Sequence, residues 1–508
     1  MQINVLEYFE LGALAEHRNK TAVIDQERRF TFSEIERCAK NCAAMILRCT
    51  SELNRPVAVF LPKSAETVIA DLGILYSGNC YANLDLKTPS ERLKAVIKNL
   101  GPSLIVSSSA HAGTLRDLGV PEHQVIFVEV ATAPGSFHDN AALMSRLDNV
   151  IDTDPLCIIH TSGSTGIPKG VALNHRSTID FMDWVFQRLK LDGSEVIGSL
   201  SPFHFDIYTL ELYLCLAKGA TLVIVPEQCA VFPVTLLEFM SSHAISFIFW
   251  VPTIMVNIAN QDLFAVRKLE TLRKVFFAGE VFPTKSLNYW RRHLPGAQFV
   301  NLYGPIEICV DCTFFIVDRD MADDEKLPIG FACRNTDILI LNDQNQLVQG
   351  TETGELCVRG SSLALGYWND PKRTAEAFVQ NPLNPHYPER IYRTGDLVYR
   401  NDRGELMIVG RRDFQIKHLG YRIELGDIEY AVMRLDGIRN ACVVYIHDRK
   451  EIVLFFESAQ ELSSADIRGQ LAPFLPKYML PSACHRLDLM PRNPNGKIDR
   501  QRLASRIF

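Results

Sequence analysis

Short apolar segments rich in β-branched residues alternate with longer amphipathic segments along most of the chain. This alternation is typical of βα units, in which strands buried on both faces form largely parallel sheets that are covered by helices. The sequence therefore predicts an α/β fold with a large N-terminal domain of layered sheets. The predicted strands are residues 56–61, 102–108, 123–129, 155–161, 220–226, 245–251 and 273–279.

The pattern changes in the last third of the chain. Around Leu356 to Arg412, short strands are separated by glycine and Asp-Arg-Gly turns, which predicts a small β-rich subdomain of hairpins. After Arg412, residues 426–435 have helical spacing, 440–448 and 450–457 read as strands around a charged turn, and 463–475 begin with serine caps before another helix. We place a domain boundary near Asp413, before a small α+β domain.

Composition excludes some classes of function. The chain has 508 residues, a formal net charge of -6 and no lysine- or arginine-rich block, which argues against a nucleic-acid partner. Its most apolar window, residues 244–259, is shorter than a membrane span and contains Pro252, so it predicts a buried strand, a turn and a helix. Glu7 and Glu10 interrupt what a signal peptide would need, so we expect a cytoplasmic protein with no membrane partner.

The 13 cysteines are scattered, as expected for reduced and mostly buried thiols. Cys309 and Cys312 form a CxxC, but no second such pair and no histidine pair stands at metal-ligand spacing. This pattern is too weak to predict a zinc or redox site.

The stretch HTSGSTGIPKGV, His160 to Val171, combines glycines, hydroxyl residues and one lysine. A P-loop requires a serine or threonine directly after the lysine, whereas Gly170 follows Lys169, so that interpretation fails. The backbone N–H groups, hydroxyls and lysine can still surround a polyphosphate. The alternative is a polar loop that only connects two elements.

Six motifs follow one another in order: TSGSTGIPKG, NLYGPIE, GELCVRGSSLALGYW, YRTGDL, GRRDFQIKHLGYRIELGDIE and NPNGKIDR. Together they resemble the core motifs of the adenylate-forming (ANL) superfamily, which includes acyl- and aryl-CoA synthetases, luciferases and the amino-acid adenylation domains of nonribosomal peptide synthesis. The resemblance covers nearly the whole chain. It implies that a carboxylate attacks the α-phosphate of ATP, giving an acyl-adenylate and pyrophosphate.

The resemblance also implies roles for particular residues. Glu307 would help to hold Mg²⁺, Asp396 with Arg411 would bind the ribose hydroxyls, and Tyr303 would lie against adenine. Lys497 would hold the carboxylate and the α-phosphate in line, so that Lys497, Glu307 and Lys169 form the catalytic set. The loop over the β- and γ-phosphates would comprise Thr161, Ser162, Gly163, Ser164, Thr165, Gly166 and Lys169.

A rotation of the small domain is a further implication of the resemblance. Residues 1–410 would form the core domain, 411–413 the hinge around Asp413, and 414–508 a mobile C-terminal domain. Rotation would remove Lys497 and bring the loop around Gly420 to the site, where a thiol attacks the adenylate. Glycine suits a place where a thiol arm passes close to the backbone. In amino-acid activating members the thiol is the phosphopantetheine arm of a separate carrier protein, and coenzyme A is the rival acceptor.

Asp206 of FHFDIYTLELY matches the aspartate that pairs with the substrate ammonium in amino-acid activating members. A buried carboxylate needs such a cation, although an aspartate here could instead be a helix N-cap. The implied pocket would be narrowed by two phenylalanines and suit a small or ring-shaped side chain. Its residues are Asp206, Ile207, Leu210, Phe249, Phe276, Ala278, Leu302, Val310 and Asp311.

This pocket resembles that of prolyl-carrier-protein ligases except at Asp311, where those enzymes usually have a small neutral residue. Asp311 would bind a second nitrogen or hydroxyl of the substrate, or point to water. The chain also resembles D-alanyl-carrier-protein ligases, but Ala278 replaces their characteristic cysteine. A further departure is Ile306, where the family usually has threonine.

The favoured function is ATP-dependent activation of L-proline or a small cyclic analogue and its transfer to a carrier protein. The alternatives are a ligase for a short diamino acid or D-alanine, an acyl- or aryl-CoA synthetase, which Asp206 disfavours, and a catalytically silent homologue. Retention of Lys169, Glu307, Asp396 and Lys497 argues against the last.

Overall fold

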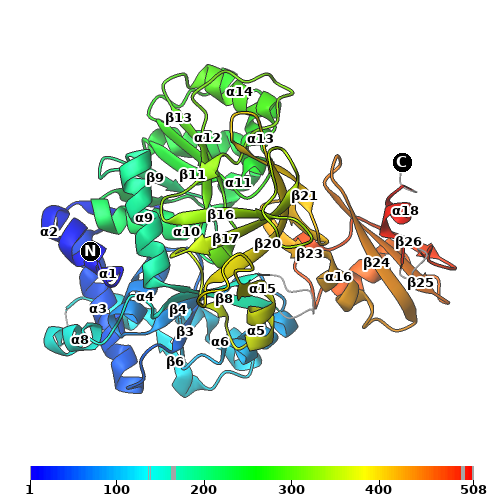
Figure 1. Ribbon diagram of the computed structural model, residues 1–508. Coiled ribbons are helices and arrows are strands. Elements are labelled where there is room, and N and C mark those ends of the chain that lie inside the picture. Colours follow the sequence, from blue (N-terminus) through cyan, green and yellow to red (C-terminus); the bar gives the residue numbers. More distant parts are fainter. Residues whose placement is uncertain (1, 136, 138, 162–167, 493–497, 506–508) are drawn as a thin grey trace. The chain divides into compact units, whose positions relative to one another are not determined.

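The structure is a computed structural model that describes residues 2–135, 137, 139–161, 168–492 and 498–505 (Figure 1). The chain forms two compact units. The first comprises Met1–Asp85, Pro102–Ile159 and Val171–Arg412, and the second comprises Leu86–Gly101, His160–Gly170 and Asp413–Phe508. The expected division into 1–410, 411–413 and 414–508 stays a prediction.

The first sheet runs in the order β15-β14-β13-β12-β11-β9-β10-β1-β2. Strands β13, β12, β11, β9, β10 and β1 are parallel to their neighbours, while β2, β14 and β15 pair antiparallel at the two edges. The strands are β1 Thr21–Asp25, β2 Arg28–Thr31, β9 Val196–Ser199, β10 Thr221–Ile224, β11 Phe247–Trp250, β12 Lys274–Phe277, β13 Gln298–Tyr303, β14 Thr313–Ile316 and β15 Phe331–Ala332.

The second sheet runs in the order β18-β8-β7-β4-β3-β5-β6, with parallel pairing of β3, β4, β5, β6 and β7. All seven strands expected from the apolar segments are present in these two sheets, so the predicted parallel, helix-covered architecture is confirmed. The strands are β3 Pro56–Phe60, β4 Cys80–Asn83, β5 Leu104–Ser107, β6 Val125–Phe127, β7 Pro155–Thr161, β8 Lys169–Asn174 and β18 Gly366–Tyr367.

The third sheet is antiparallel and forms the predicted β-rich part of the first unit. Its order is β16-β17-β20-β19, and β21 pairs with β20. The strands are β16 Thr336–Leu341, β17 Gly354–Gly360, β19 Phe378–Gln380, β20 Arg390–Arg400 and β21 Leu406–Arg411.

Helices cover both faces of the first sheet, since successive side chains along a strand belong alternately to two buried clusters, one on each face. In β11, Phe247 and Phe249 pack with α9 and α10 in one cluster, whereas Ile248 and Trp250 pack with α12, α13 and α14 in the other. The helices of the first unit are α1 Leu6–Tyr8, α2 Leu14–His17, α3 Phe32–Cys49, α4 Ala65–Tyr76, α6 Ala112–Asp117, α7 Val128–Thr132, α8 Asn140–Leu147, α9 His175–Leu189, α10 Ile207–Lys218, α11 Glu227–Val231, α12 Pro233–Ser242, α13 Pro252–Asn260, α14 Thr284–His293 and α15 Pro371–Ala377.

The second unit has the α+β content expected of the C-terminal region. Strands β24 (Ile438–Ile446) and β25 (Glu451–Ser458) pair antiparallel, and β26 (Ala483–Leu487) adds parallel to β25. The predicted serine cap is confirmed, because Ser463 forms a capping box with Asp466 at the start of α17 (Ser464–Leu471). Its other elements are α5 Ser90–Leu100, α16 Leu425–Val432, α18 Arg500–Ala504, β22 Gln415–His418 and β23 Tyr421–Glu424.

The apolar window 244–259 forms buried β11 and helix α13, as expected. Within the described ranges, no helix is long and apolar enough to cross a membrane. Most cysteines are buried thiols, including Cys309 and Cys312, and burial raises the pKa of the Cys309 thiol to about 12. Such thiols stay protonated and are poor nucleophiles.

Candidate active site

Tyr303, Asp396 and Arg411 form one buried polar group. Asp396 on β20 and Arg411 on β21 are directly paired across the two strands, and the Arg411 guanidinium donates to Asp396 Oδ1 at 2.7 Å. The Tyr303 hydroxyl, at the end of β13, donates to Asp396 Oδ2. Burial, reinforced by the Asp396 charge, raises the pKa of Tyr303 well above its usual range, so the hydroxyl stays a donor. A carboxylate has about four acceptor positions, so Asp396 retains capacity for further donors.

The segment Gly304–Asp311 is a closed loop between β13 and β14. The Cys312 N–H donates to the Tyr303 carbonyl at 2.8 Å, and Tyr303 pairs with Thr313 across the strands. Gly304 lies against the returning backbone so closely that a Cβ on it would stand 2.4 Å from the Asp311 Cα. Only glycine fits at such a distance. The loop, which carries Glu307, Val310 and Asp311, is therefore held by its own backbone.

Two consecutive residues of this loop are in the left-handed region, Cys309 with φ +53° and Val310 with φ +63°. This conformation is costly for any side chain and especially for a β-branched one, at roughly 1–3 kcal/mol per residue. Val310 is nevertheless buried in the main apolar cluster. The surrounding structure thus imposes a strained turn at the position where the pocket wall is predicted.

Glu307 is the predicted magnesium ligand and is 0% exposed. The Tyr367 hydroxyl of β18 donates to Glu307 Oε1 at 2.8 Å, and the Ala364 N–H donates to the Glu307 carbonyl at 2.9 Å. Both bonds come from the GELCVRGSSLALGYW motif, so two separate motifs meet here. Together they fix the backbone and the carboxylate of Glu307.

The seven apolar residues of the predicted pocket belong to one buried cluster. Phe249 on β11 is the direct partner of Phe276 on β12, with ring centroids 6.5 Å apart, and Ala278 follows at the carboxyl end of β12. If the alignment that assigns the pocket residues were shifted by one position, it would select Ile248 or Phe277. These side chains lie on the other face of the sheet and belong to the second cluster. The alignment at Phe249 and Phe276 therefore agrees with the strand faces. The seven residues are Ile207, Leu210, Phe249, Phe276, Ala278, Leu302 and Val310.

The two carboxylates of the predicted pocket, Asp206 and Asp311, differ in burial. Asp206 stands at the N-cap position of α10 but its side chain makes no capping hydrogen bond with the helix, which disfavours the alternative of a structural cap. Asp206 is half-buried, so the expectation of a buried carboxylate is wrong for this residue. Asp311 is only 2% exposed, which excludes the alternative that it points to water.

Other predicted residues lie in the second unit. Thr161 is the buried last residue of β7, and Lys169 is the half-buried first residue of β8. Asp413 is exposed, and its carboxylate accepts from the Gln415 N–H at 3.2 Å. The remaining predicted residues, Ser162, Gly163, Ser164, Thr165, Gly166 and Lys497, lie outside the described residues.

Gly420 forms the two-residue turn of the β22–β23 hairpin with Leu419, and both have positive φ, +54° at Leu419 and +83° at Gly420. This is the conformation of the tight turns preferred in hairpins, which favour glycine. The geometry of the turn is therefore a local reason for a glycine at position 420, in addition to the predicted approach of a thiol arm.

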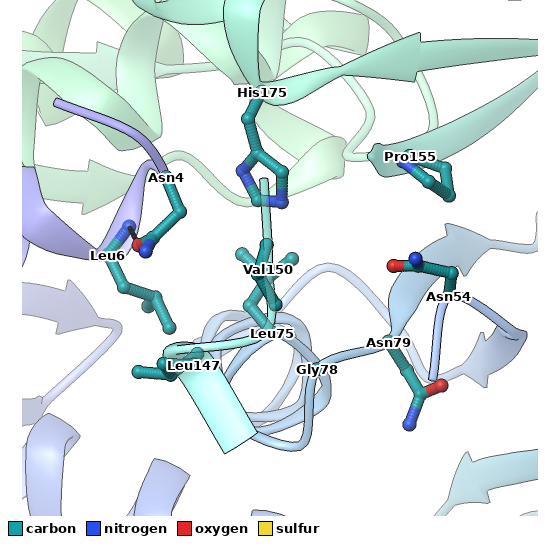
Figure 2. A pocket seen from close by; sticks show the side chains of 10 residues that line it. All are labelled: Asn4, Leu6, Asn54, Leu75, Gly78, Asn79, Leu147, Val150, Pro155 and His175. Atoms are coloured by element: carbon teal, nitrogen blue, oxygen red, sulfur yellow. Dashed lines mark hydrogen bonds between the residues drawn. The ribbon is translucent and has the colours of Figure 1, made fainter. Parts of the chain in front are cut away.

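A pocket in another part of the first unit contains none of the predicted site residues (Figure 2). His175 lies at its top in the view, and Asn4, Asn54 and Asn79 surround it. His175 Nδ1 accepts from the Val5 N–H at 3.3 Å, and burial lowers the pKa of this histidine to about 4. His175 is therefore neutral near pH 7, and its bond to the N-terminal segment indicates a structural role.

Sequence reasoning missed two residues that hold the loop of Glu307, Tyr367 and Gly304, and one buried carboxyl group outside the predicted site, Asp71. Tyr367 stands in a quoted motif, and Gly304 stands in YGPIE, so a closer study of each motif could have identified both. Asp71 is a lone aspartate in the apolar helix α4, and that isolation was the available signal. Its hydrogen-bond partners come from distant parts of the chain, so no spacing rule predicts them.

Comparisons with known proteins identify the family and the fold of the chain. The family described as AMP-binding enzyme matches residues 12–368. Tyrocidine synthase 1 of Brevibacillus parabrevis is 30% identical over 96% of this chain and 43% of its own length. Gramicidin S synthase 2 of Brevibacillus brevis is 32% identical over 95% of this chain and 10% of its own length. The chain thus spans less than half of these large synthases.

Other relatives have similar lengths. Zwittermicin A synthase ZmaJ of Bacillus cereus is 29% identical over 96% of this chain and 92% of its own length. The adenylation domain AlmE of Vibrio cholerae, solved in complex with glycyl-adenosine-5'-phosphate, superposes with a TM-score of 0.84 at 22% identity, covering 100% of this chain and 98% of that one. IdnL1 superposes with a TM-score of 0.80 at 28% identity, covering 96% and 99%.

The family match covers most of the chain, and the solved adenylation domains share its sheets and its small C-terminal part. The chain therefore belongs to the AMP-binding enzyme family and has the ANL adenylation fold.

Proposed function

We propose that this enzyme activates an amino acid as its aminoacyl-adenylate and transfers it to the phosphopantetheine thiol of a separate carrier protein. The observation that carries the proposal is Asp206, a half-buried carboxylate that makes no capping bond with α10 and is followed by the pocket residues Ile207 and Leu210. A carboxylate beside an apolar wall suits a substrate with an ammonium group and an apolar side chain.

In the first step, a carboxylate oxygen of the amino acid bonds to the α-phosphorus of ATP, and pyrophosphate leaves with the bridging oxygen. Lys169 and Lys497 supply positive charge for this step, and Asp396 with Arg411 holds the ribose. In the second step, a thiolate attacks the acyl carbon, AMP leaves, and the thiol proton passes to solvent. The hinge at Asp413 separates the two steps, with Gly420 facing the incoming thiol.

The residues present fit a magnesium ion. Nucleotide enzymes hold Mg²⁺ through one or two carboxylates, substrate phosphates and water, so no cage of protein ligands is required. Among the described residues, no cluster of three or more histidine, cysteine or acidic side chains forms such a cage. Glu307, oriented by Tyr367, is the carboxylate that would hold the ion, which would neutralise phosphate charge.

Phe249 and Phe276, paired on adjacent strands, would narrow the predicted pocket, which favours a small or cyclic side chain with L-proline as the first candidate. The burial of Asp311 supports a second candidate, an amino acid with an additional nitrogen, since a buried carboxylate is stabilised by a cationic partner. D-Alanine remains a smaller alternative.

A carrier protein as the source of the thiol is supported by solved relatives. PA1221 is described as an NRPS protein containing adenylation and PCP domains, and NpsA-ThdA as an artificially fused adenylation-PCP di-domain. ZmaJ, of similar length to this chain, is named as a synthase of zwittermicin A. We expect the thiol to be offered in trans.

ATP–pyrophosphate exchange tests the substrate. The panel contains the proteinogenic amino acids, D-alanine, pipecolate, piperazate and short diamino acids, each with the wild type, Asp206→Asn and Asp311→Asn. If exchange is fastest with proline and is lost only in Asp206→Asn, the result supports the first candidate. If exchange is fastest with a substrate that has a second nitrogen and is also lost in Asp311→Asn, the result supports the second candidate. Exchange with fatty or aryl acids alone would contradict amino-acid activation.

A further inference from the structure

A buried carboxyl group outside the predicted site is bonded to the segment that carries Asp206. Asp71 lies in α4 and is 0% exposed, and every residue of that helix except Glu66 is buried. Asp71 Oδ2 accepts from the Tyr208 hydroxyl at 3.0 Å and from Asn83 Nδ2 at 3.1 Å. These three residues, here called the Asp71 network, come from α4, β4 and α10.

The network reaches the residues on both sides of Asp206. Asn83 Nδ2 also donates to the Phe203 carbonyl at 3.2 Å. The Phe203 ring stacks on the Tyr208 ring, with centroids 3.9 Å apart and an angle of 17° between the planes. Phe203 precedes Asp206 by three residues and Tyr208 follows it by two, so both flanks of the turn are attached to Asp71.

The backbone hydrogen bonds inside this turn are local, and they run from Phe205 N to the Pro202 carbonyl, from Tyr208 N to the Phe205 carbonyl and from Thr209 N to the Asp206 carbonyl. They set the shape of the turn, whereas the Asp71 network joins it to α4 and β4. A small cavity, lined in part by Tyr81, Asn83, Phe203 and Tyr208, lies beside it. Where packing is incomplete, directional hydrogen bonds decide the position of the backbone.

We propose that Asp71, through Asn83 and Tyr208, is a positioning residue that fixes the turn of Asp206 and so sets the affinity for the ammonium group of the substrate. This inference rests on the proposed function, because it assigns the consequence of the network to Asp206. Displacement of the turn weakens the ion pair with the ammonium, while the nucleotide contacts at Asp396 and Arg411 stay in place.

The alternative is that the network only stabilises the fold. Loss of a buried hydrogen bond then lowers the melting temperature and the active fraction, without changing the KM for the amino acid. Kinetics at saturating ATP and at saturating amino acid distinguish the two roles.

The test uses four variants of the full chain. Tyr208→Phe removes one hydroxyl and Asp71→Leu removes the acceptor, whereas Asp71→Asn keeps an acceptor oxygen in the same place. Tyr76→Phe is the matched control. Tyr76 is a buried tyrosine of α4, the helix that carries Asp71, and its hydroxyl donates to a carboxylate, Glu10, at 2.6 Å. The probe is the amino acid with the fastest wild-type ATP–pyrophosphate exchange in the panel described above, which includes D-alanine, pipecolate, piperazate and short diamino acids.

We expect Tyr208→Phe and Asp71→Leu to raise the KM for the amino acid about tenfold, the size of one directed hydrogen bond, while the KM for ATP changes less than about twofold. Asp71→Asn should restore the wild-type KM. Tyr76→Phe should lower the melting temperature and leave both KM values unchanged.

An unchanged KM for the amino acid in both Tyr208→Phe and Asp71→Leu, with a lowered melting temperature, overturns the inference and leaves the proposed function intact. If Asp71→Leu does not fold, Tyr208→Phe decides alone. Absence of wild-type exchange with every amino acid of the panel described above overturns both, and is visible before any variant is compared.

Discussion

The predicted pocket has two carboxylates, and the structure holds the segments that carry them in different ways. Asp311 lies on the loop Gly304–Asp311, which is closed by its own backbone and contains a strained turn at Cys309 and Val310. Asp206 lies on a turn attached to Asp71 through side chains from two other elements. A backbone-closed loop depends on a glycine within its motif, whereas a side-chain network depends on residues far away in the sequence.

The largest effect should come from placing a Cβ in the backbone-closed loop. Gly304→Ala brings a methyl group within 2.4 Å of the Asp311 Cα, so the loop must open and Glu307 and Asp311 must move. Since misplaced catalytic groups cost on the order of 10²-fold in rate, we expect at least that loss of ATP–pyrophosphate exchange together with a lower melting temperature. Gly296→Ala is the control, because a Cβ there meets nothing within 4 Å. Equal activity of the two variants would show that the loop tolerates displacement.

The stability contributed by the side-chain network should depend on pH, whereas the stability of the backbone-closed loop should not. Burial raises the pKa of Asp71 to about 8, against an ordinary value of 3.8. Between these values the unfolded chain has lost its proton and the folded chain keeps it, so stability falls as pH rises from about 4 to about 8 and then levels. Asp71→Asn places a side chain that does not ionise at this position, so the variant does not lose this stability as pH rises. The melting temperature of the variant minus that of the wild type should therefore increase by several degrees from about pH 4 to about pH 8.

The comparison isolates Asp71 because the other groups are unchanged in the variant. Glu211, which burial also keeps at a pKa of about 8, contributes equally to both proteins. The ionisable groups that interact with Asp71 are tyrosines and thiols, which are neutral over the same range: Cys42, Tyr81, Cys157, Tyr208 and Tyr213. A difference in melting temperature that does not vary with pH would show that Asp71 is ionised in the folded protein.

The smallest effect should come from losing a side-chain hydrogen bond that β18 makes to the backbone-closed loop. Tyr367→Phe removes the hydroxyl that donates to Glu307, while the Ala364 N–H still holds the Glu307 carbonyl. One hydrogen bond to a charged group contributes about 1.5–3 kcal/mol, so kcat should fall about tenfold or somewhat more. Exchange measured against Mg²⁺ concentration checks this, and a loss as large as that of Gly304→Ala would mean that the backbone does not hold the loop by itself.

The contrast also explains what the sequence could predict. The alternating apolar segments predicted the strands of both main sheets, because burial of a parallel sheet imposes a local pattern. The motifs predicted Tyr303, Asp396 and Arg411, which the fold brings into one hydrogen-bonded group. Strand faces then agreed with Phe249 and Phe276. These features are encoded by short segments.

Features that depend on long-range contacts were not predictable. Asp71 and Tyr208 are separated by 137 positions, and neither has a local pattern that indicates the other. The half-burial of Asp206 and the full burial of Asp311 depend on how loops from different strands meet, so the sequence analysis misjudged the first and left the second open.

The most direct measurement of the central claim compares an amino acid with its analogue that lacks the amine, such as L-proline with cyclopentanecarboxylic acid if proline proves to be the substrate. The ratio of their kcat/KM values in ATP–pyrophosphate exchange is determined for the wild type and for Asp206→Asn. Amino-acid activation predicts a large preference for the amine in the wild type and its loss by about 10²-fold or more in the variant, because an ion pair is removed at the site. An equal ratio in the two proteins would contradict the account, since Asp206 would then not bind the ammonium group.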